Sequence, residues 1–372
     1  MRKRTLIPLL IAVAAFAALG VMLYLRAKAP PEAARLLPES DAILYVNLQP
    51  LRAATHFDKS PIARSPGFQS FIDATGIVPE RDIDSAAFAL HKVPVLLGSG
   101  TASPIHASDL FSSEVFTGRF DGQRLAKYLA SITSTQETYA GRIVYTIHLQ
   151  TDDPGGQTLR VAQLAYDTIA ASNMSTPEQI HSMLDRSRAS ALGTPGCSLL
   201  AARFHNVPLL AQAWGIGHIG LPFSHNGEIT VMGLELPLPA ESDLVASLRY
   251  TPAERVLSGG AVLLRIEEFA PDSTAAQTTV DSLTAILGLL RGIDSATPPH
   301  NSSDAALRQV IASTHIEQRN ERALLDSSAT LDQVKALFSA HDPAAEPTPP
   351  TDAPIAPPPC NLPGKNKKPN LC

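Results

Sequence analysis

One stretch of the 372-residue chain brings together the residue types that nucleophilic hydrolysis needs. Ser99 stands in the turn 98–100 and is followed by His106 and Asp109. A nucleophile elbow requires the pattern G-x-S-x-G between a strand and a helix, and this stretch does not have it. Cys197 is expected to be a small buried residue and not a nucleophile. We therefore expect a solvated loop at Ser99 and predict that the protein is not an enzyme.

Two pairs of neighbouring acids could serve acid–base chemistry or bind calcium. Asp152 and Asp153 precede a Pro-Gly-Gly sequence, which is typical of a hairpin turn. Glu267 and Glu268 follow a predicted strand at 261–266, and we expect them to mark its exposed end. Neither pair has a partner cluster that the sequence shows, so no catalytic role is predicted for them.

Three histidines, His205, His218 and His225, could in principle converge on a metal ion. No two of them are spaced i, i+4, and no nearby cysteine completes a known set of zinc ligands. We interpret them as surface or loop histidines and predict no metal site.

The glycines Gly215, Gly217 and Gly220 match the dinucleotide pattern G-x-G-x-x-G. They follow a helix-like stretch ending at Trp214, and a turn follows them where a Rossmann unit has a helix. We predict a helix end with a turn here, and no cofactor.

The C-terminal tail carries the most informative cysteines. Cys360 and Cys372 enclose the sequence NLPGKNKKPNL, and in an oxidising compartment they could close a loop. Three lysines, Lys365, Lys367 and Lys368, would make this loop a basic tip that contacts an anionic envelope polymer or a partner protein. The alternative is a solvated tail whose lysines contact nothing.

An uncharged run of 21 residues, 5–25, lies between Arg4 and Arg26. At about 1.5 Å per residue a helix of this length spans roughly 31 Å, enough for the core of a bilayer. The run is longer than the h-region of a signal peptide, and Lys28 and Pro30 lie where cleavage would occur. We predict a membrane anchor in preference to a cleaved signal peptide. Basic residues on both flanks leave the orientation open, but the terminal cysteine pair and the proline-rich spacer before it favour an exported body.

Composition defines the remaining segments. With 44% hydrophobic residues the chain can build one large domain or two medium ones, and a net charge of −5 with 5% aromatic residues argues against nucleic-acid binding. The predicted division is a cytoplasmic N-terminus 1–4, the transmembrane anchor 5–25, a linker 26–35, two α+β units at 36–190 and 195–340, and a proline-rich disordered tail 341–372.

The two α+β units are predicted from an internal duplication. Three pairs of similar segments recur in the same order, namely those at Pro50 and Pro208, at Val115 and Val245, and at Thr176 and Thr330. Each unit is expected to form a mainly antiparallel sheet with helices packed on one side. Asp121 is predicted to cap the helix that follows the strand at Val115, and the second unit has an extra predicted helix at 274–291 followed by a loop at 292–304. Chance similarity of short apolar patterns is the alternative.

The sequence LLPESD at 36–41, with the predicted strand 42–48, resembles the start of uncharacterised bacterial envelope proteins that share a domain of unknown function. The resemblance covers 36–340. It implies an N-terminal membrane helix before an extracytoplasmic α+β region and brings no catalytic residues.

These observations favour a non-catalytic binding or scaffolding protein of the cell envelope. It would be a single-pass protein of a bacterial inner membrane, with the membrane as a partner through 5–25 and most of the chain in the periplasm. A carrier of hydrophobic small molecules or lipids is one alternative, and it needs an apolar cavity. A hydrolase with an unrecognised site is the other, and it needs convergent polar groups in a cleft. The sequence leaves the oligomeric state open.

Overall fold

The structure is a computed structural model. It describes residues 20, 28–59, 64–91, 111–149, 157–189, 196–218, 228–231, 234–237, 242–251, 260–296, 299 and 301–339.

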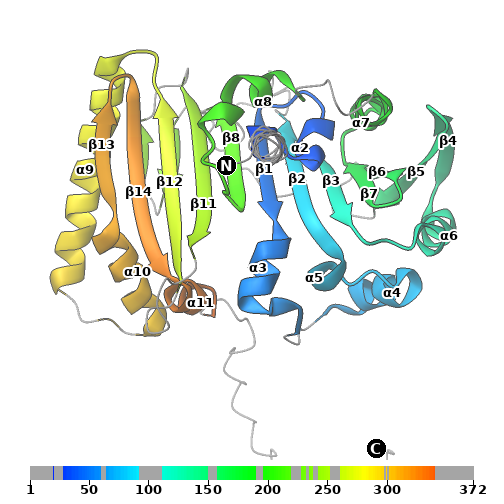
Figure 1. Ribbon diagram of the computed structural model, residues 1–372, viewed down its shortest axis with the longest axis horizontal. Coiled ribbons are helices and arrows are strands. Elements are labelled where there is room, and N and C mark those ends of the chain that lie inside the picture. Colours follow the sequence, from blue (N-terminus) through cyan, green and yellow to red (C-terminus); the bar gives the residue numbers. More distant parts are fainter. Residues whose placement is uncertain are drawn as a thin grey trace, which may run out of the picture.

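Twelve strands form one sheet in which every neighbouring pair is antiparallel (Figure 1). From one edge to the other they are β13 (His315–Arg319), β14 (Arg322–Thr330), β12 (Ala261–Phe269), β11 (Asp243–Thr251), β8 (Ala213–His218), β1 (Ala42–Asn47), β2 (Ile83–His91), β3 (Phe111–Gly118), β7 (Thr168–Ser172), β6 (Gln157–Ala165), β5 (Arg142–Leu149) and β4 (Thr135–Tyr139). We call β1–β7 the first half and β8 with β11–β14 the second half. The two halves join where β1 pairs with β8, which we call the seam. A separate hairpin pairs β9 (Glu228–Val231) with β10 (Leu234–Pro237).

Side chains alternate between the two faces of a strand. We therefore name each face of the sheet after one residue of β1 whose side chain points to it. Tyr45 and Leu44 of β1 point to opposite faces, which we call the Tyr45 face and the Leu44 face. Tyr45 is 7% exposed and Leu44 is 40% exposed.

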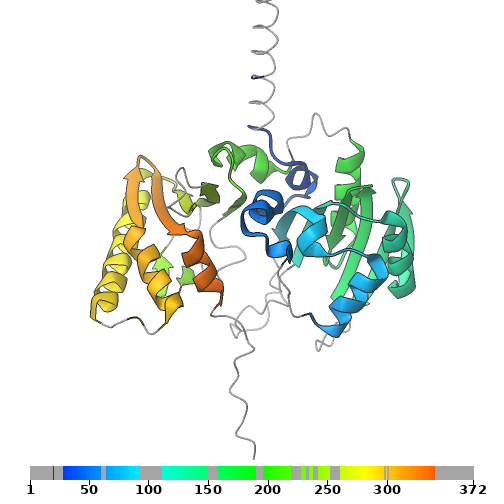
Figure 2. The ribbon, with the colours of Figure 1, turned by 60° about the horizontal axis from the view of Figure 1, so that its bottom comes forward.

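The helices lie on both faces of this sheet (Figure 2). They are α2 (Glu32–Leu36), α3 (Leu48–Thr55), α4 (Pro66–Thr75), α5 (Pro79–Asp82), α6 (Gly122–Ile132), α7 (Glu178–Arg188), α8 (Ser198–Arg203), α9 (Ser273–Ala296), α10 (Ser302–Ser313) and α11 (Leu331–Ser339), with short 3-10 turns at Phe57–Lys59 (η1) and Phe204–Asn206 (η3). Helices α2, α7 and α8 contribute to the core of the Tyr45 face. Helix α6 packs on the Leu44 face of the first half.

Local sequence explains several helix boundaries. Asp121 caps α6 by accepting hydrogen bonds from the backbone amides of Gln123 and Arg124 at 3.1 Å each, as the sequence predicts. Thr330 and Gln333 form a reciprocal capping box at the start of α11. At Gly76, a φ of 75° ends α4 in the left-handed conformation that glycine adopts readily.

The predicted fold class is wrong about how the strands and helices are arranged. Two separate repeated units with helices on one side were expected, but the strands form one continuous sheet with helices on both faces. Helices cover both faces because β5 and β6 present apolar side chains alternately to each: Val144 faces one core and Tyr145 the other.

The paired segments do not occupy equivalent positions throughout. Val115 lies on β3, the third strand from the seam, whereas Val245 lies on β11, the second strand from the seam. Pro50 follows β1, but Pro208 precedes β8. Only Thr176 and Thr330 match, since each separates a strand from a helix. The unit boundaries 36–190 and 195–340 stay a prediction.

No helix in the described part of the chain is long and apolar enough to cross a membrane. The longest, α9, has 24 residues but carries Asp281 and Arg291 together with many hydroxyl side chains, so only one stripe of it is apolar. This finding corrects the predicted transmembrane helix and the single-pass location in a bacterial inner membrane. The run 5–25 lies outside the described residues apart from Gly20.

Candidate functional site

One row of directly paired residues crosses all twelve strands on the Tyr45 face. From β4 to β13 it consists of Glu137, Val144, Ala162, Ala170, Val115, Ala87, Tyr45, Trp214, Ser247, Arg265, Asp326 and His315. The row is apolar from β5 to β8 and becomes polar or charged from β11 onward. The change of chemistry therefore falls immediately beyond the seam.

In the first half this face is buried beneath α2 and α7. Ile180 and Met183 of α7 are 0% exposed, and they pack in the same cluster as Val144 and Ala162. Beneath these helices the described side chains of the face form a packed core, and a hollow of about 510 Å³ lies only at its β4 edge, beside Tyr139 and α7.

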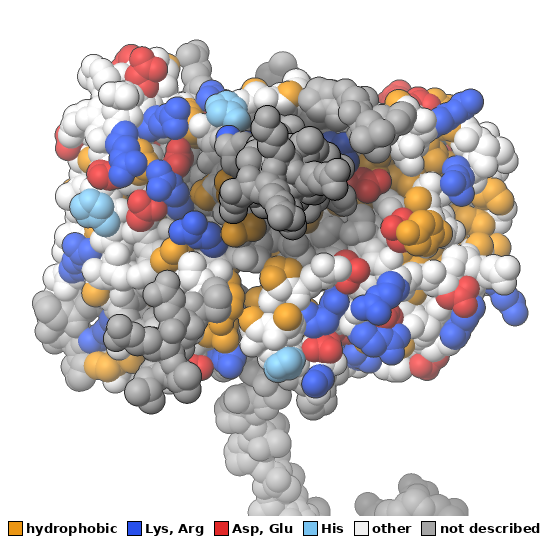
Figure 3. Space-filling view, viewed as in Figure 1, with side chains coloured by type: hydrophobic (Ala, Val, Ile, Leu, Met, Phe, Trp, Pro, Cys, Tyr) orange, Lys and Arg blue, Asp and Glu red, His pale blue; other side chains and the backbone are white. Residues whose placement is uncertain are grey.

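In the second half the same face reaches solvent. The side chains of Arg265, Asp326 and His315 are 32%, 42% and 73% exposed. Figure 3 shows basic and acidic side chains interspersed over the second half of the sheet. An antiparallel sheet with one solvated face is ordinary, so the local geometry must show whether a site exists here.

A hollow of about 330 Å³ lies on this exposed face, and we call it the arginine–serine pocket. Its charged lining residues are Arg249, Arg265, His315 and Asp326; four serines complete its polar lining, and Pro208 also lines it. The volume is at the lower end of the range for small-molecule sites, roughly 300–1,000 Å³.

The two arginines of the pocket differ in their contacts. Arg265 donates from Nε to Oε1 of Glu267 at 2.7 Å, and its Nη1 lies 3.9 Å from Oδ2 of Asp326. Arg249 is exposed and has neither a hydrogen bond nor an ion pair with any other described side chain. Its guanidinium is therefore free to bind an anionic group.

The serines of the pocket are engaged mainly with one another and with the backbone. Ser313 donates to the carbonyl oxygen of Ser328 at 2.7 Å, and its Oγ lies 3.2 Å from Oγ of Ser327. No hydrogen bond joins His315 to a described serine; within the described part of the chain its ion-pair contact is Glu317, at 4.0 Å. The pocket thus contains serine, histidine and aspartate without the hydrogen-bonded order that an activated nucleophile needs.

A stacked cluster supports the end of the exposed face nearest α8. The guanidinium groups of Arg203 and Arg322 each lie 4.6 Å from the ring centre of Phe269. Arg203 also donates to Asp243 at 2.5 Å, and Arg322 lies 3.5 Å from Glu267. These arginines are fixed by structural contacts and are less available to a ligand than Arg249.

A second hollow, of about 520 Å³, lies over the seam, and we call it the seam groove. Its aromatic lining residues are Tyr45, Phe204 and Trp214; Tyr45 stacks on Trp214 at 5.3 Å, and Phe204 meets Trp214 edge-on at 5.4 Å. Leu209 and Leu210 form its rim, and they are 41% and 78% exposed. The hollow is open to solvent and is not an enclosed cavity between sheet and helices.

A serine–histidine contact does exist elsewhere, in the core of the first half. Nε2 of His91 lies 2.9 Å from Oγ of Ser113, which lies 3.1 Å from Oγ of Ser172. The three residues are 5%, 0% and 2% exposed. Burial lowers the pKa of His91, so the imidazole is neutral there. With no access for a substrate among the described residues, the contact satisfies buried polar groups.

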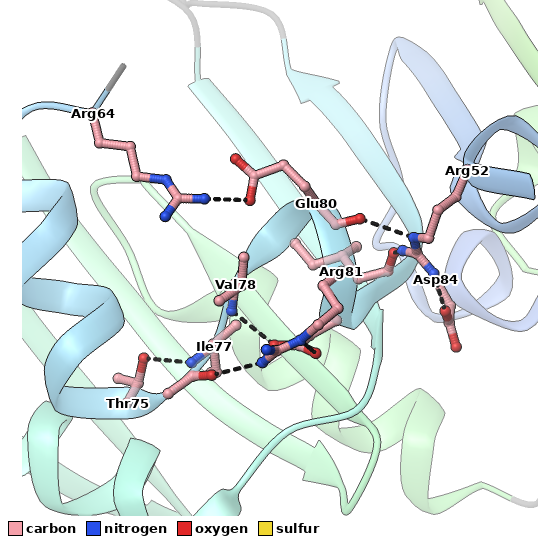
Figure 4. Close-up of polar contacts among 11 residues, drawn as sticks. Arg52, Arg64, Thr75, Ile77, Val78, Glu80, Arg81 and Asp84 are labelled. Atoms are coloured by element: carbon pink, nitrogen blue, oxygen red, sulfur yellow. Dashed lines mark hydrogen bonds and ion pairs between the residues drawn. The ribbon is translucent and has the colours of Figure 1, made fainter. Parts of the chain in front are cut away.

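The corner between α3, α5 and β2 holds another concentration of charge (Figure 4). Arg52 donates to the carbonyl oxygens of Glu80 and Ile83 and to Oδ1 of Asp84, the last at 3.1 Å. Arg64 pairs with Glu80 at 3.1 Å. These contacts hold both arginines against the protein, although Nε of Arg64 has no hydrogen-bond partner among the described residues, so the corner is structural.

The acids at 267 and 268 are placed differently from the prediction. Both lie within β12 and are buried, at 6% and 3% exposed, because the strand continues to Phe269. Glu267 faces the arginines on the Tyr45 face. Glu268 faces α9 on the other side, where the hydroxyls of Ser242 and Thr279 are its polar neighbours and its carboxyl has no hydrogen-bond partner in the described structure. Burial raises the pKa of Glu268.

The glycines of the G-x-G-x-x-G pattern are also explained by packing. Gly215 and Gly217 lie within strand β8, not after a helix. A Cβ at Gly215 would lie 2.8 Å from Leu44, and one at Gly217 would lie 2.9 Å from Ala42. The glycines therefore permit close contact with β1, which sequence reasoning missed. Gly220 lies outside the described residues.

Two of the three histidines that the sequence analysis considered as metal ligands are described, and they do not converge. His205 lies in η3, and His218, at the end of β8, contacts Asp243. Among the described residues no group of three or more metal-ligating side chains forms. Cys197 is fully buried before α8, and burial raises the pKa of its thiol, as expected for an unreactive residue.

Other predicted candidates lie outside the described residues: Ser99, His106, Asp109, Asp152, Asp153, His225, Cys360, Lys365, Lys367, Lys368 and Cys372. The arginine–serine pocket was missed because Arg249 and Arg265 carry no motif. Their alternation on predicted strands was the available signal, but it does not show which strands pair.

Comparisons with known proteins give little further guidance. No protein-family model matches the chain, and no curated protein matches it. Solved structures of TP0453 in crystal forms III, I and IV have TM-scores of 0.41, 0.39 and 0.41 and sequence identities of 12%, 12% and 11%. They cover 84% of this chain and 99%, 98% and 98% of theirs. This similarity is too weak to support an argument about fold or function.

Proposed function

We propose that this protein is a non-catalytic binding protein that holds an anionic group of its ligand in the arginine–serine pocket. The observation that carries the proposal is Arg249, a guanidinium in a hollow with no partner among the described side chains. Arg265 supplies a second positive charge beside it. Arginine pairs with carboxylate, sulfate or phosphate through two parallel hydrogen bonds, which gives the pocket its selectivity.

Asp326 limits the charge of the pocket. Its carboxylate lies within ion-pair distance of Arg265, so Arg249 is the charge that remains for a ligand. A ligand with a single anionic group fits this balance better than a polyanion does.

The two earlier alternatives are less well supported by the geometry. The carrier of hydrophobic molecules needs an enclosed apolar cavity, whereas the seam groove is open at Leu209 and Leu210. The hydrolase needs an ordered nucleophile and base, and in the pocket the serines bond to one another instead of to His315.

The test is calorimetric titration of the full chain with inorganic phosphate and with acetate. We expect weak, saturable binding that Arg249→Gln reduces about tenfold, the effect of losing one charge-assisted hydrogen bond. Lys127→Gln is the matched control, because Lys127 is an exposed cation on α6, far from the pocket. Equal binding by both variants would refute the proposal.

The C-terminal tail stays a second proposed contact. A disulfide between Cys360 and Cys372 would present Lys365, Lys367 and Lys368 to an anionic partner of the envelope. Thiol labelling of the full chain tests the disulfide: both cysteines should react only after reduction, while ready labelling of the untreated protein would exclude it.

A further inference from the structure

The seam groove and the arginine–serine pocket adjoin each other on the Tyr45 face. Pro208 lines both hollows. Trp214 of the groove is the direct cross-strand neighbour of Ser247 of the pocket. Arg249 lies on β11, the strand next to β8, and is two residues along from Ser247, so it is displaced from Trp214 by about 4.8 Å across the sheet and roughly 6.7 Å along the strand.

The two hollows offer opposite chemistry over that distance. The floor of the groove is formed by Tyr45 and Trp214, which are 7% and 4% exposed, and the partly buried Phe204 and the exposed Leu209 and Leu210 line it above them. The pocket presents the guanidinium of Arg249, which has no partner among the described side chains. Aromatic rings pack edge-on or offset against one another, and two of the groove's side chains already do so.

We propose that the ligand is a small aromatic anion, with its anionic group at Arg249 and its ring in the seam groove. The inference rests on the proposed function and adds the class of ligand. An anionic group and a ring separated by a short aliphatic chain would reach both hollows at once. A ligand with either part alone would fill only one of them.

The backbone at the rim supports this role for Leu210. Leu210 has a φ of 66°, a left-handed conformation that is unfavourable for a leucine, and its side chain is nevertheless 78% exposed. A hydrogen bond from the amide of Ala211 to the carbonyl oxygen of Pro208, at 3.2 Å, closes the turn that requires this conformation, but it does not cover the apolar side chain, whose exposure to water remains a cost. Contact with the ring of a bound ligand would recover part of it.

The experiment uses 4-phenylbutanoate, its neutral amide and acetate as probes. Trp214 is the single tryptophan of the chain and lines the groove, so its fluorescence reports occupation of the groove directly. We expect 4-phenylbutanoate to change the emission and to bind at least tenfold more tightly than acetate or the amide.

Two variants separate the contribution of the anionic group from that of the aromatic ring. Arg249→Gln should weaken 4-phenylbutanoate about tenfold and leave the amide unchanged. Leu210→Ser keeps the strained backbone and removes the apolar rim; it should weaken both aromatic probes about fivefold and leave acetate unchanged. Lys127→Gln should change none of these values.

A failure of the proposed ligand class and a failure of the proposed function would give different results. If Arg249→Gln weakens acetate and 4-phenylbutanoate alike while Leu210→Ser has no effect, the anion pocket stands and the aromatic ligand is refuted. If Arg249→Gln weakens the binding of neither acetate nor 4-phenylbutanoate, both the aromatic ligand and the proposed function are refuted. Circular dichroism of each variant shows whether a loss reflects misfolding, which neither exposed position should cause.

Discussion

The two halves of the Tyr45 face differ although the same rows of paired residues cross both. In the first half, Val144 and Ala170 are 0% exposed beneath helices. In the second half, Arg265 and Asp326 occupy the same row and reach solvent. Continuous pairing thus fixes where each side chain points, while the helices decide whether that direction is core or surface.

Helix placement explains the difference. In the first half α7 returns over the Tyr45 face, and its Ile180 joins that core. In the second half α9 and α10 lie on the Leu44 face, where Thr279 of α9 is beside Glu268 and the carbonyl of Val310 accepts a hydrogen bond from Ser327. The second half therefore leaves the part of its Tyr45 face beyond α8, around Arg249 and Arg265, open to solvent.

The largest expected effect tests the covered half. Ile180→Ala should lower the free energy of unfolding by about 2–5 kcal/mol, because it opens a cavity at a fully buried position. Leu263→Ala, at a partly exposed position on the same face of the second half, should cost less than about 1.5 kcal/mol. Urea denaturation measures both, and equal losses would contradict the contrast between the halves.

The next largest expected effect on stability is that of replacing Arg52. Arg52→Ala in the first half removes the donor for two carbonyls and for Asp84 and leaves them partly buried. The free energy of unfolding should fall by roughly 1–3 kcal/mol. Chemical denaturation of the variant gives the value, and an unchanged midpoint would mean that water replaces these contacts.

The buried acid of the second half should make stability depend on pH. Burial raises the pKa of Glu268 above its ordinary value of 4.5, so the native state keeps a proton that the unfolded chain has lost. This contribution is complete below pH 4.5 and decreases as pH rises toward the folded-state pKa, by up to about 1.4 kcal/mol per pH unit. Glu268→Gln should remove that slope in unfolding measured across this window.

An exposed acid provides the control for this effect. Glu321→Gln changes the same type of residue on the surface of the second half and should leave the slope unchanged. If the slope persists in Glu268→Gln, another group is responsible for it.

The smallest expected effect on stability is at the binding pocket. Arg249→Gln should change the free energy of unfolding by less than about 0.5 kcal/mol, because Arg249 is exposed and contacts no described partner. Thermal unfolding measures this change. A marked loss of stability would show that Arg249 is structural, like Arg52.

Much of the local structure could be predicted from the sequence. The strand at Val115 and the helix capped by Asp121 follow from alternation and capping, and the predicted helix 274–291 corresponds to α9. The loop after it is shorter than expected, since α9 continues to Ala296 and α10 begins at Ser302. Boundaries of this kind depend on packing that a local pattern does not contain.

By itself the sequence determined several strands and helices, such as β3 and α6, and which side chains share one face of those strands, because these properties depend on local periodicity. Tertiary structure alone decided that the strands join at β1 and β8 into one sheet, that Glu268 is buried, and that Arg249 and Arg265 meet in an open pocket. Those outcomes depend on which strands pair and which face each helix covers. Both are set by contacts between residues far apart in the chain.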